Sequence, residues 1–425
     1  MGAFDPVAYI NEPRWQQSRL GLERITELLE RMGRPQDCLR FVHVAGTNGK
    51  GSTCAYLASV LQASGYRTGL FTSPYVIEFA ERIRIDGVNI PHDDLMSVTL
   101  FVREHAEAMA SESGEHPTEF ELMTAVAFEH FARSQCDVVV CEVGLGGRLD
   151  STNIIQDPEV CVITRIGLDH TDFLGDTPAA IAGEKAGIIK PSAPVVSWPQ
   201  DDEEAMRVIE DAAASCDSQL IVPDFHQLHV QPIVEGGRRA FAYKGREFST
   251  KLLATYQPYN ATLAVEALNV LRQRGWGISQ GALVRGIADA SWPGRFEVVE
   301  AGAPPVIVDG GHNPQGAAVL ADSLRDVYPD KRVVFVMSVL ADKDYRAMIE
   351  AVVPLAGAFV CATPPNPRAL KAQELADVVR AHGVDAYVSS SFEDALVQAR
   401  ELATPEDVIC AFGSLYSIGD IMRAL

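Results

Sequence analysis

One short segment combines glycines, a lysine and a hydroxyl residue in an order that proteins use to hold phosphate. Residues 42–53 read VHVAGTNGKGST. The glycines allow backbone N–H groups to approach phosphate oxygens, Lys50 can neutralise the β- and γ-phosphates, and Ser52 can reach a phosphate or Mg²⁺. The spacing departs from the standard G-x-x-x-x-G-K-[ST] pattern, because Val44 replaces the first glycine and Gly51 follows the lysine. We predict a nucleotide-binding loop; the alternative is a tight turn between a strand and a helix.

Polar side chains also stand at or after the ends of two later strands. Glu142 ends the apolar run 137–143 (DVVVCEV), His170 follows the next run, and Lys185 lies on the helix after that. A carboxylate among apolar strand residues must be paired or bound to a metal. Taken singly, the three residues are more simply a buried ion pair, a loop histidine and a solvated lysine. Their repeated placement favours one shared site, because open α/β sheets bind ligands at the carboxyl ends of their strands.

A fourth polar segment lies in the last third of the chain. Residues 308–314 read VDGGHNP, a strand end followed by a glycine turn and a helix start. Asp309 and His312 are placed where a second domain can close on a bound nucleotide. The alternative is a helix capped by Asn313 with no ligand.

Short apolar runs alternate with helical patterns over most of the chain, which predicts a parallel sheet covered by helices on both faces. The strands expected first are 40–45, 68–72, 137–143 and 160–164. The expected helices are 51–63, 119–133, 177–189, 258–274 and 279–290. The segment 227–252 differs, since Gly-Gly and Lys-Gly turns separate short strands, and it predicts a small antiparallel insertion.

A domain boundary is expected at SWPGRF, residues 291–296, where proline and glycine follow a helix. A second series of alternating strands and helices begins after it. Its strands are expected at 306–309, 332–337, 358–362, 386–388 and 408–412. The sequence therefore predicts an α/β protein with an N-terminal P-loop domain, 1–292, and a C-terminal Rossmann-like domain, 297–425.

Composition limits the classes of function. The chain has 425 residues, 47% apolar and 22% charged, which excludes general disorder. With 36 Lys and Arg against 57 Asp and Glu, the net charge is −21, which disfavours nucleic acid and anionic membranes as partners. No apolar run approaches the ~20 residues of a membrane span, and the N-terminus lacks the pattern of a secretory signal. Eight scattered cysteines indicate reduced thiols, so we expect a cytoplasmic protein.

Taken together, the motifs resemble the folate branch of the Mur ligase superfamily, which comprises folylpolyglutamate synthases and their bifunctional relatives with dihydrofolate synthase activity. In order, the motifs are AGTNGKGST at 45–53, FTSPY at 71–75, ERIRIDG at 81–87, TEFE at 118–121, EVGLGGRLDSTN at 142–153, DHTDFLG at 169–175, EKAGIIK at 184–190, PYNA at 258–261, PGRF at 293–296, DGGHNP at 309–314 and FGSLY at 412–416. The variant spacing of the phosphate loop is typical of this family. The resemblance covers nearly the whole chain and implies a Mur-ligase-type ATPase domain at its N-terminal side.

The resemblance implies an ATP-dependent amide ligase that adds L-glutamate to dihydropteroate and to reduced folates through an acyl phosphate. By motif position, the residues implied in ATP binding are Gly46, Thr47, Asn48, Gly49, Lys50, Gly51, Ser52, Asn260, Arg295 and Asp309. Those implied in binding two Mg²⁺ ions are Ser73, Glu142, His170 and Lys185. Those implied in substrate binding are Arg82, Thr118, Glu119, Phe120, Glu121, Leu149, Asp150 and Ser151. Those implied in catalysis are Lys50, His170, Lys185 and His312.

Lys185 poses a problem of charge, because an ammonium beside two Mg²⁺ ions would be repelled. The resemblance implies carbamylation, which converts the amine into an anionic oxygen ligand of the kind that Mg²⁺ prefers. Lys185, rather than Lys190, is the candidate by motif position. The alternative is an unmodified lysine that pairs with Glu184 or with a phosphate.

Three other functions remain open at this stage. One is folylpolyglutamate synthesis alone, and the second is a cell-wall Mur ligase, although no room precedes the loop for the additional domain of those enzymes. The third is a P-loop switch without ligase chemistry, which would leave the DGGHNP segment unexplained. We expect a monomer that acts on small molecules.

Overall fold

The computed structural model describes residues 4–12, 19–234 and 237–425, and it contains three sheets. The largest has eight strands in the order β4-β3-β2-β5-β1-β6-β7-β8. Its strands are β1 Phe41–Ala45, β2 Thr68–Phe71, β3 Ile83–Ile85, β4 Val88–Asn89, β5 Val138–Glu142, β6 Val160–Ile163, β7 Val195–Ser197 and β8 Leu220–Ile221. Strands β2, β5, β1, β6, β7 and β8 run parallel, whereas β3 and β4 form an antiparallel edge.

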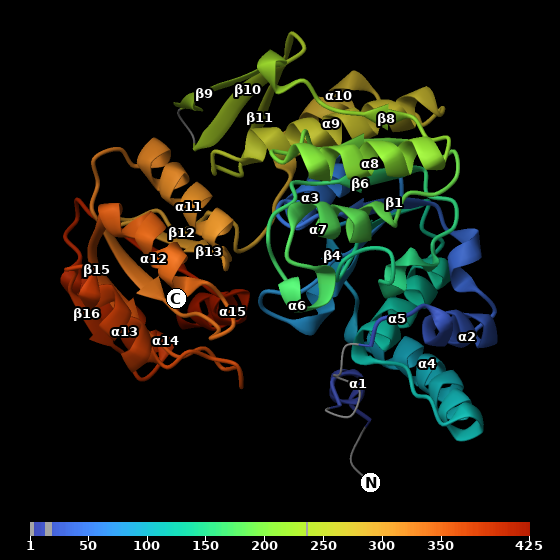
Figure 1. Cartoon of the computed structure of the whole chain (residues 1–425), viewed down its shortest axis with the longest axis horizontal. Helices are drawn as coiled ribbons and strands as arrows, with labels where there is room; N and C mark the ends of the chain where they lie inside the picture. The colour runs from blue at the N-terminus through green and yellow to red at the C-terminus, as the bar shows by residue number, and fades with distance from the viewer. Residues whose placement is uncertain (1–3, 13–18, 235–236) are drawn as a thin grey trace.

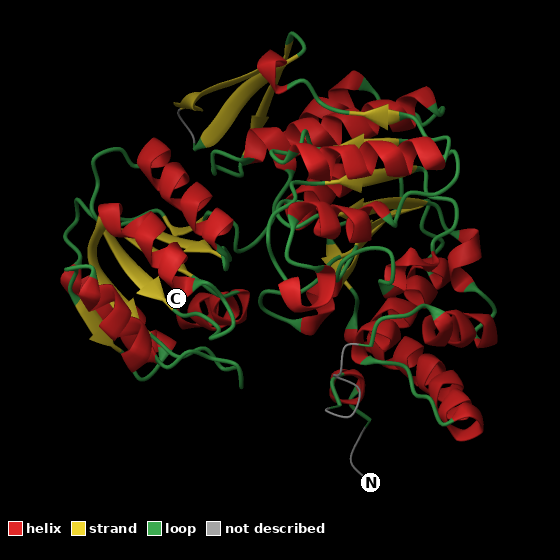
Figure 2. Ribbon diagram, in the orientation of Figure 1, coloured by secondary structure: helices red, strands yellow, loops and turns green. Residues whose placement is uncertain are grey.

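Helices cover both faces of this sheet (Figure 2). The helices of this unit are α1 Pro6–Ile10, α2 Glu23–Arg31, α3 Lys50–Ala63, α4 His92–Ser113, α5 Glu119–Arg133, α6 Thr171–Leu174, α7 Pro178–Ala186, α8 Glu203–Ser215, α9 Gln257–Gln273 and α10 Gln280–Asp289. Short 3₁₀ turns are η2 Pro35–Cys38, η3 Phe79–Arg82, η4 Ser151–Ile154 and η5 Phe225–Gln227. Alternate residues of β1 face opposite cores: Val42 and Val44 pack with α3, α9 and α10, while Phe41 packs with α2, α4 and α5. The strands therefore carry continuous apolar runs, as expected for a sheet buried on both sides.

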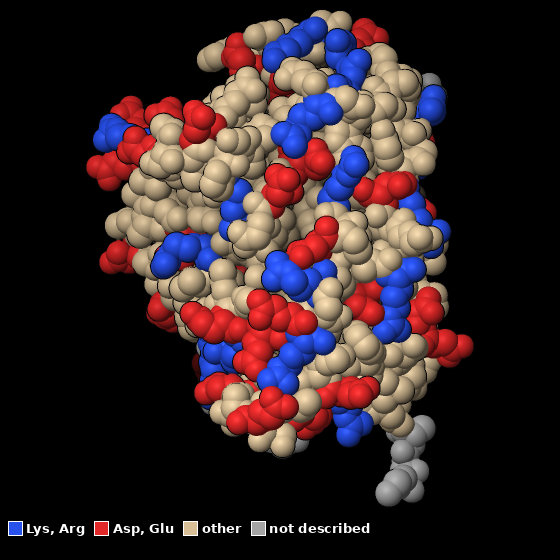
Figure 3. Space-filling model, turned by 90° about the vertical axis from the view of Figure 1, so that its right-hand side faces the viewer, with Lys and Arg blue, Asp and Glu red and all other residues tan. Residues whose placement is uncertain are grey.

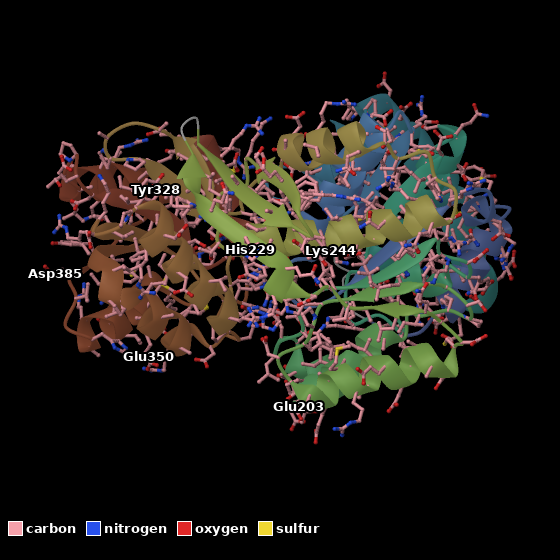
Figure 4. All side chains as sticks on the ribbon, turned by 90° about the horizontal axis from the view of Figure 1, so that it is seen from above. Glu203, His229, Lys244, Tyr328, Glu350 and Asp385 are labelled. Carbon is pink, nitrogen blue, oxygen red and sulfur yellow. The ribbon has the colours of Figure 1, made fainter. Side chains whose placement is uncertain are left out.

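The second sheet is the predicted antiparallel insertion, with β9 Leu228–Val234, β10 Arg238–Tyr243 and β11 Arg246–Thr250 in the order β11-β10-β9. It lies at the top of Figure 1, to the left of α9 and α10. Seen from above, it stands between the body of the first unit and the C-terminal unit, with His229 and Lys244 on it (Figure 4). Arg239 of β10 forms an ion pair with Asp326 of helix α11, which belongs to the C-terminal unit.

The third sheet, coloured orange to red in Figure 1, has the order β12-β13-β17-β14-β15-β16. Its strands are β12 Glu297–Glu300, β13 Val306–Asp309, β14 Val333–Met337, β15 Ala356–Cys361, β16 Ala386–Val388 and β17 Val408–Phe412. Its helices are α11 Pro314–Val327, α12 Tyr345–Val352, α13 Ala372–Ala381, α14 Phe392–Leu402 and α15 Leu415–Ala424, with the turn η6 Val353–Leu355. Helices α11, α12 and α13 pack on one face, and α14 and α15 pack on the other.

The fold class predicted from the sequence is confirmed: two mainly parallel α/β sheets, each with an antiparallel edge, and a small antiparallel insertion. The helix expected at 177–189 ends earlier, at Ala186, and Gly187 is its C-cap residue. The short strands β3, β4, β7, β8 and β12 were not among the expected elements. The domain boundaries at 292 and 297 stay a prediction.

Two surface properties bear on partners. On the face shown in Figure 3, acidic and basic side chains are interspersed, so this face carries no large patch of one sign. Among the described residues, no helix combines the length and apolar character needed to cross a membrane.

Candidate active site

A single cleft gathers all the residues predicted for ATP, metal and catalysis. It is bounded by the loops after β1, β2, β5 and β6 and by α7 and α9. The segment just before β12 and the loop after β13 close it on the C-terminal side. The predicted residues that line it are Gly46, Thr47, Asn48, Gly49, Lys50, Gly51, Ser52, Ser73, Glu142, His170, Lys185, Asn260, Arg295, Asp309 and His312. Their common placement follows from the parallel sheet, whose strands all present their carboxyl ends at one edge. The role of each residue stays a prediction.

The phosphate loop leaves β1 at Ala45 and enters α3 at Lys50. Gly49, the N-cap, has φ +93°, and an added Cβ there would lie 2.6 Å from Oδ1 of Asn260. Only glycine fits such a left-handed position without strain. Lys50 Nζ donates to the carbonyl oxygens of Gly46 at 3.1 Å and Thr47 at 3.4 Å. The loop therefore holds its lysine over the turn at the helix N-terminus, where an anion would bind.

Gly51 is the residue that makes the loop spacing unusual, and the structure gives a steric reason for a glycine at this position. An added Cβ would lie 2.5 Å from Cζ2 of Trp292, which belongs to the segment joining the two units. The indole of Trp292 also faces the guanidinium of Arg84 at 5.9 Å. The sequence pattern alone could not show this contact, because the two residues are far apart in the chain.

We expect Gly51→Ala to weaken ADP binding about tenfold or more, because overpacking costs about 1–3 kcal/mol and must displace either α3 or Trp292. Titration calorimetry with ADP measures the effect. The matched double variant, Gly51→Ala with Trp292→Ala, provides space for the new methyl group and should recover most of the affinity. Unchanged ADP affinity in the single variant would contradict this account of the spacing.

Glu142 ends β5 as a buried carboxylate with few partners. One oxygen accepts the N–H of Ser73 at 3.4 Å, and the other lies 3.9 Å from Lys50 Nζ. Burial raises the pKa of Glu142 to about 7, against the opposing effect of Lys50. A buried carboxylate with unused lone pairs fits a bound cation. Within the described ranges, no group of three or more His, Cys, Asp or Glu side chains is arranged to hold a metal.

Lys185 is a second unusual group on the cleft wall. Its side chain is buried, and Nζ donates to the carbonyl oxygen of Gly46 at 2.8 Å. Burial, helped by the charge of Lys50, lowers the pKa of Lys185 to about 7. The pairing with Glu184 that we considered is absent, since Glu184 accepts from Arg148 at 2.7 Å. Lys185 therefore lies in the cleft as an amine that is readily deprotonated.

His170 and His312 both lie close to the same carboxylate oxygen of Asp169. Nε2 of His312 is 3.7 Å, and Nε2 of His170 is 4.0 Å, from Oδ2 of Asp169. Burial alone would raise the pKa of Asp169, but the nearby His312, His170 and Lys343 hold it well below its usual range. Burial lowers the pKa of His170. Asp169 thus remains an anion that faces both histidines.

On the C-terminal side, Asp309 braces the turn that carries His312. It accepts the N–H groups of Phe296 at 2.8 Å and Gly311 at 2.7 Å, and burial raises its pKa. Asn313 does cap α11, accepting from Gly316 at 2.7 Å. Its amide also donates across the cleft to Oδ1 of Asn48 at 3.3 Å. Asn313 therefore both caps the helix and contacts the phosphate loop.

The residues predicted for substrate binding do not line this cleft. Thr118 and Glu121 form a capping box at the start of α5, and Glu121 also pairs with Arg24 at 3.1 Å. Asp150 directs one oxygen to the N–H of Leu145 at 2.8 Å and the other to Thr152. These contacts all lie within the first unit. A direct contact with substrate stays a prediction for Thr118, Glu121, Leu149, Asp150 and Ser151.

Three of the predicted substrate residues do lie close to the cleft wall. Phe120 packs against Gly144, where an added Cβ would lie 2.3 Å from its ring. Arg82 is buried with its guanidinium 4.9 Å from the ring of Tyr75, and burial lowers its pKa. Glu119 is half-buried near Arg82, and burial raises its pKa. This group borders the cleft on the side of Ser73.

Sequence reasoning missed several cleft residues. Asp169 stood inside the DHTDFLG motif, beside the histidine that we selected. Gln315 follows Asn313 by two residues and accepts a hydrogen bond from the Asn48 amide. Arg165 also lines the cleft, and its carbonyl oxygen accepts the N–H groups of Thr47 and Asn48 at 3.1 Å. A closer reading of the quoted motifs would have found Asp169, whereas the Gln315 contact depends on how the two units meet.

Comparisons with known proteins agree with this architecture. Two family models match, the Mur ligase middle domain over residues 44–268 and the Mur ligase glutamate ligase domain over residues 294–415. The dihydrofolate synthase/folylpolyglutamate synthase of Bacillus subtilis is 37% identical over 99% of both chains. The folylpolyglutamate synthase of Lacticaseibacillus casei is 34% identical over 100% of this chain and 99% of its own.

A solved structure extends the similarity to three dimensions. The Escherichia coli FolC in complex with DHPP and ADP has a TM-score of 0.84 and 31% identity, covering 98% of this chain and 96% of its own. The chain belongs to the Mur ligase family of ATP-dependent ligases that form carbon–nitrogen bonds, and within it to the group of dihydrofolate synthases/folylpolyglutamate synthases.

Proposed function

We propose that this chain adds L-glutamate both to dihydropteroate, forming dihydrofolate, and to reduced folates, forming folylpolyglutamates. The observation that carries the proposal is the two-sided cleft, in which Lys50 of the phosphate loop and the buried carboxylate Glu142 lie 3.9 Å apart and face the C-terminal unit. The cleft suits a nucleotide whose terminal phosphate points toward an acid on one side and an amine on the other. Relatives that carry both activities in their names support the choice of substrates.

The reaction consists of two displacements. An oxygen of the folate-type carboxylate attacks the γ-phosphorus of ATP, the bond to the β-bridging oxygen breaks, and ADP leaves with both electrons of that bond. The amine of glutamate then attacks the acyl carbon, inorganic phosphate leaves, and the nitrogen gives up a proton as the amide forms. Such chemistry demands positioning and charge neutralisation from the protein.

The chain supplies this neutralisation from named groups. Lys50 and the N-terminus of α3 face the phosphates, while Asn260, Arg295 and Asp309 would contact ATP from the cleft walls. His312, held by its Nδ1 contact with the carbonyl oxygen of Gly310 at 2.9 Å, lines the same cleft and would act close to the reacting groups. Arg82 and Glu119 would contact the folate-type substrate at the border of the cleft.

The donor set fits Mg²⁺. Glu142 offers a buried carboxylate without a full set of partners, and Ser73 and His170 line the same cleft. Lys185 would complete the site as a carbamate. Bound there, Mg²⁺ would neutralise the charge of the phosphates. Because Mg²⁺ usually keeps waters and phosphate oxygens among its ligands, it does not require a cage of protein side chains.

ADP release tests the proposal and separates it from the alternatives. Purified protein with Mg-ATP should release ADP only when glutamate is present together with dihydropteroate or a reduced folate. If reduced folate supports release and dihydropteroate does not, only folylpolyglutamate synthesis survives. A P-loop switch would hydrolyse ATP without either acid, and a cell-wall ligase would respond to neither folate. The cytoplasmic location and the monomeric state stay predictions.

A further inference from the structure

One ion pair crosses from the C-terminal unit into the cleft wall. Nζ of Lys343 lies 2.7 Å from Oδ1 of Asp169, and the two side chains are 14% and 12% exposed. Asp169 follows β6, whereas Lys343 stands in the loop between β14 and α12. Within the part of the chain that the structure describes, it is the only ion pair between an Asp or Glu of residues 1–292 and a Lys or Arg of residues 297–425, and both of its partners are shielded from water. Such shielding makes the attraction stronger than in an exposed pair.

The loop that carries Lys343 is held in place by its neighbours. Asp342 pairs with Arg368 at 3.0 Å, and Asp344 caps α12 by accepting the N–H of Ala347 at 3.2 Å. Both acidic neighbours are thus engaged inside their own unit. Lys343 alone of the three residues extends to the other unit.

The carboxylate that Lys343 meets positions His170. Oδ1 of Asp169 also accepts the backbone N–H of His170 at 3.0 Å, and His170 has φ +52°. A left-handed backbone at a residue other than glycine persists only where its surroundings hold it. The other oxygen, Oδ2, faces the rings of His170 and His312. Asp169 therefore connects three groups, one from its own unit and two from the C-terminal unit.

We propose that Lys343 is a positioning residue of the ligase, which fixes Asp169 and through it the His170 backbone and His312 only when the two units are closed on each other. Lys343 does not line the cleft, so it acts through Asp169 rather than on substrate. The site would thereby be complete only in the closed arrangement. The kinetic test of this inference rests on the proposed ligase activity. The test of domain closure by scattering does not.

Lys343→Met removes the charge and keeps the length of the side chain. We expect kcat for ADP release to fall about 10–100-fold, as is typical when a residue that orients an active-site side chain is removed. KM for ATP should change less than about threefold. Lys343→Arg should keep most of the activity. The control is Lys331→Met, a lysine of the same unit that lies 3.9 Å from Glu406 and should leave kcat unchanged.

Two further measurements distinguish positioning from simple loss of stability. If Lys343 acts through Asp169, the double variant with Asp169→Asn should have the kcat of the more impaired single variant. Small-angle scattering with AMPPCP should give a larger radius of gyration for Lys343→Met than for the wild type. Any of three results would overturn the proposal. The first is a kcat within twofold of wild type in folded Lys343→Met, and the second is a fall in kcat of the double variant equal to the product of the falls in the two single variants. The third is an unchanged radius of gyration. If wild-type protein releases no ADP with folate substrates, the proposed function fails, and the scattering comparison still tests the ion pair.

Discussion

Lys50→Ala is expected to abolish ligation, with kcat/KM reduced about a thousandfold or more while the fold is kept, because one preorganised group at a developing charge is worth at least 10²–10³ in rate. Lys50 lies at the start of α3, and its ammonium is held over the loop by the carbonyl oxygens of Gly46 and Thr47. Among the described residues that line the cleft, Lys185 is the only other lysine, so few groups could replace Lys50. The measurement is ADP release at saturating glutamate and folate substrate.

The matched control is Lys251→Ala, a half-exposed lysine of the same unit, 3.6 Å from Asp289 and away from the cleft. Its activity should equal that of the wild type. Circular dichroism and thermal unfolding should coincide for all three proteins. Near-normal turnover by well-folded Lys50→Ala would exclude the assignment of this loop to ATP.

The second large effect is expected at Lys185. We expect Lys185→Ala to lose activity about 100-fold or more, and acetate to restore part of it by supplying a carboxylate where the carbamate would lie. The reaction that forms the carbamate is addition of CO₂ to the neutral amine, with release of a proton. The lowered pKa of about 7 leaves a large neutral fraction at neutral pH, which favours this addition.

Lys190→Ala is the control, because Lys190 is only partly buried, donates to the carbonyl oxygen of Asn153 at 3.3 Å and does not line the cleft. It should keep its activity, with or without acetate. Independent of activity, ¹³C-labelled bicarbonate should give a protein-bound carbamate resonance in the wild type that is missing from Lys185→Ala. Absence of that resonance together with absence of acetate rescue would defeat the modification.

Much of the fold was predictable because its strands are encoded locally. Five of the seven residues in the run 137–143 are Val or Cys, and β5, Val138–Glu142, forms there. The edge strands β4 and β8 have two residues each, too short for a periodic pattern to reveal them. They exist because a neighbouring strand is available for pairing, which is a property of the tertiary structure.

In the candidate site, too, some residues could be recognised from local sequence and others depend on the tertiary structure. Gly49 and Lys50 could be recognised because the loop needs glycine and lysine at a fixed spacing. Thr118 and Glu121 were assigned to substrate, yet the structure gives both a local task as a helix cap. Contacts between the units, such as Asn48 with Gln315, join residues 267 positions apart and carry no signal in either segment.

The position of β1 in the middle of the large sheet has a consequence for synthesis on the ribosome. Its hydrogen-bonded neighbours are β5 and β6, both of which come much later in the chain. At ~5–20 residues per second, the roughly 120 residues between β1 and the end of β6 take about 6–24 s to emerge. During that interval the phosphate loop is already outside the ribosome but lacks the strands that support it. ATP can therefore assist the folding of this unit only after β6 has appeared, and chaperones that shield apolar strands would act on β1 before then.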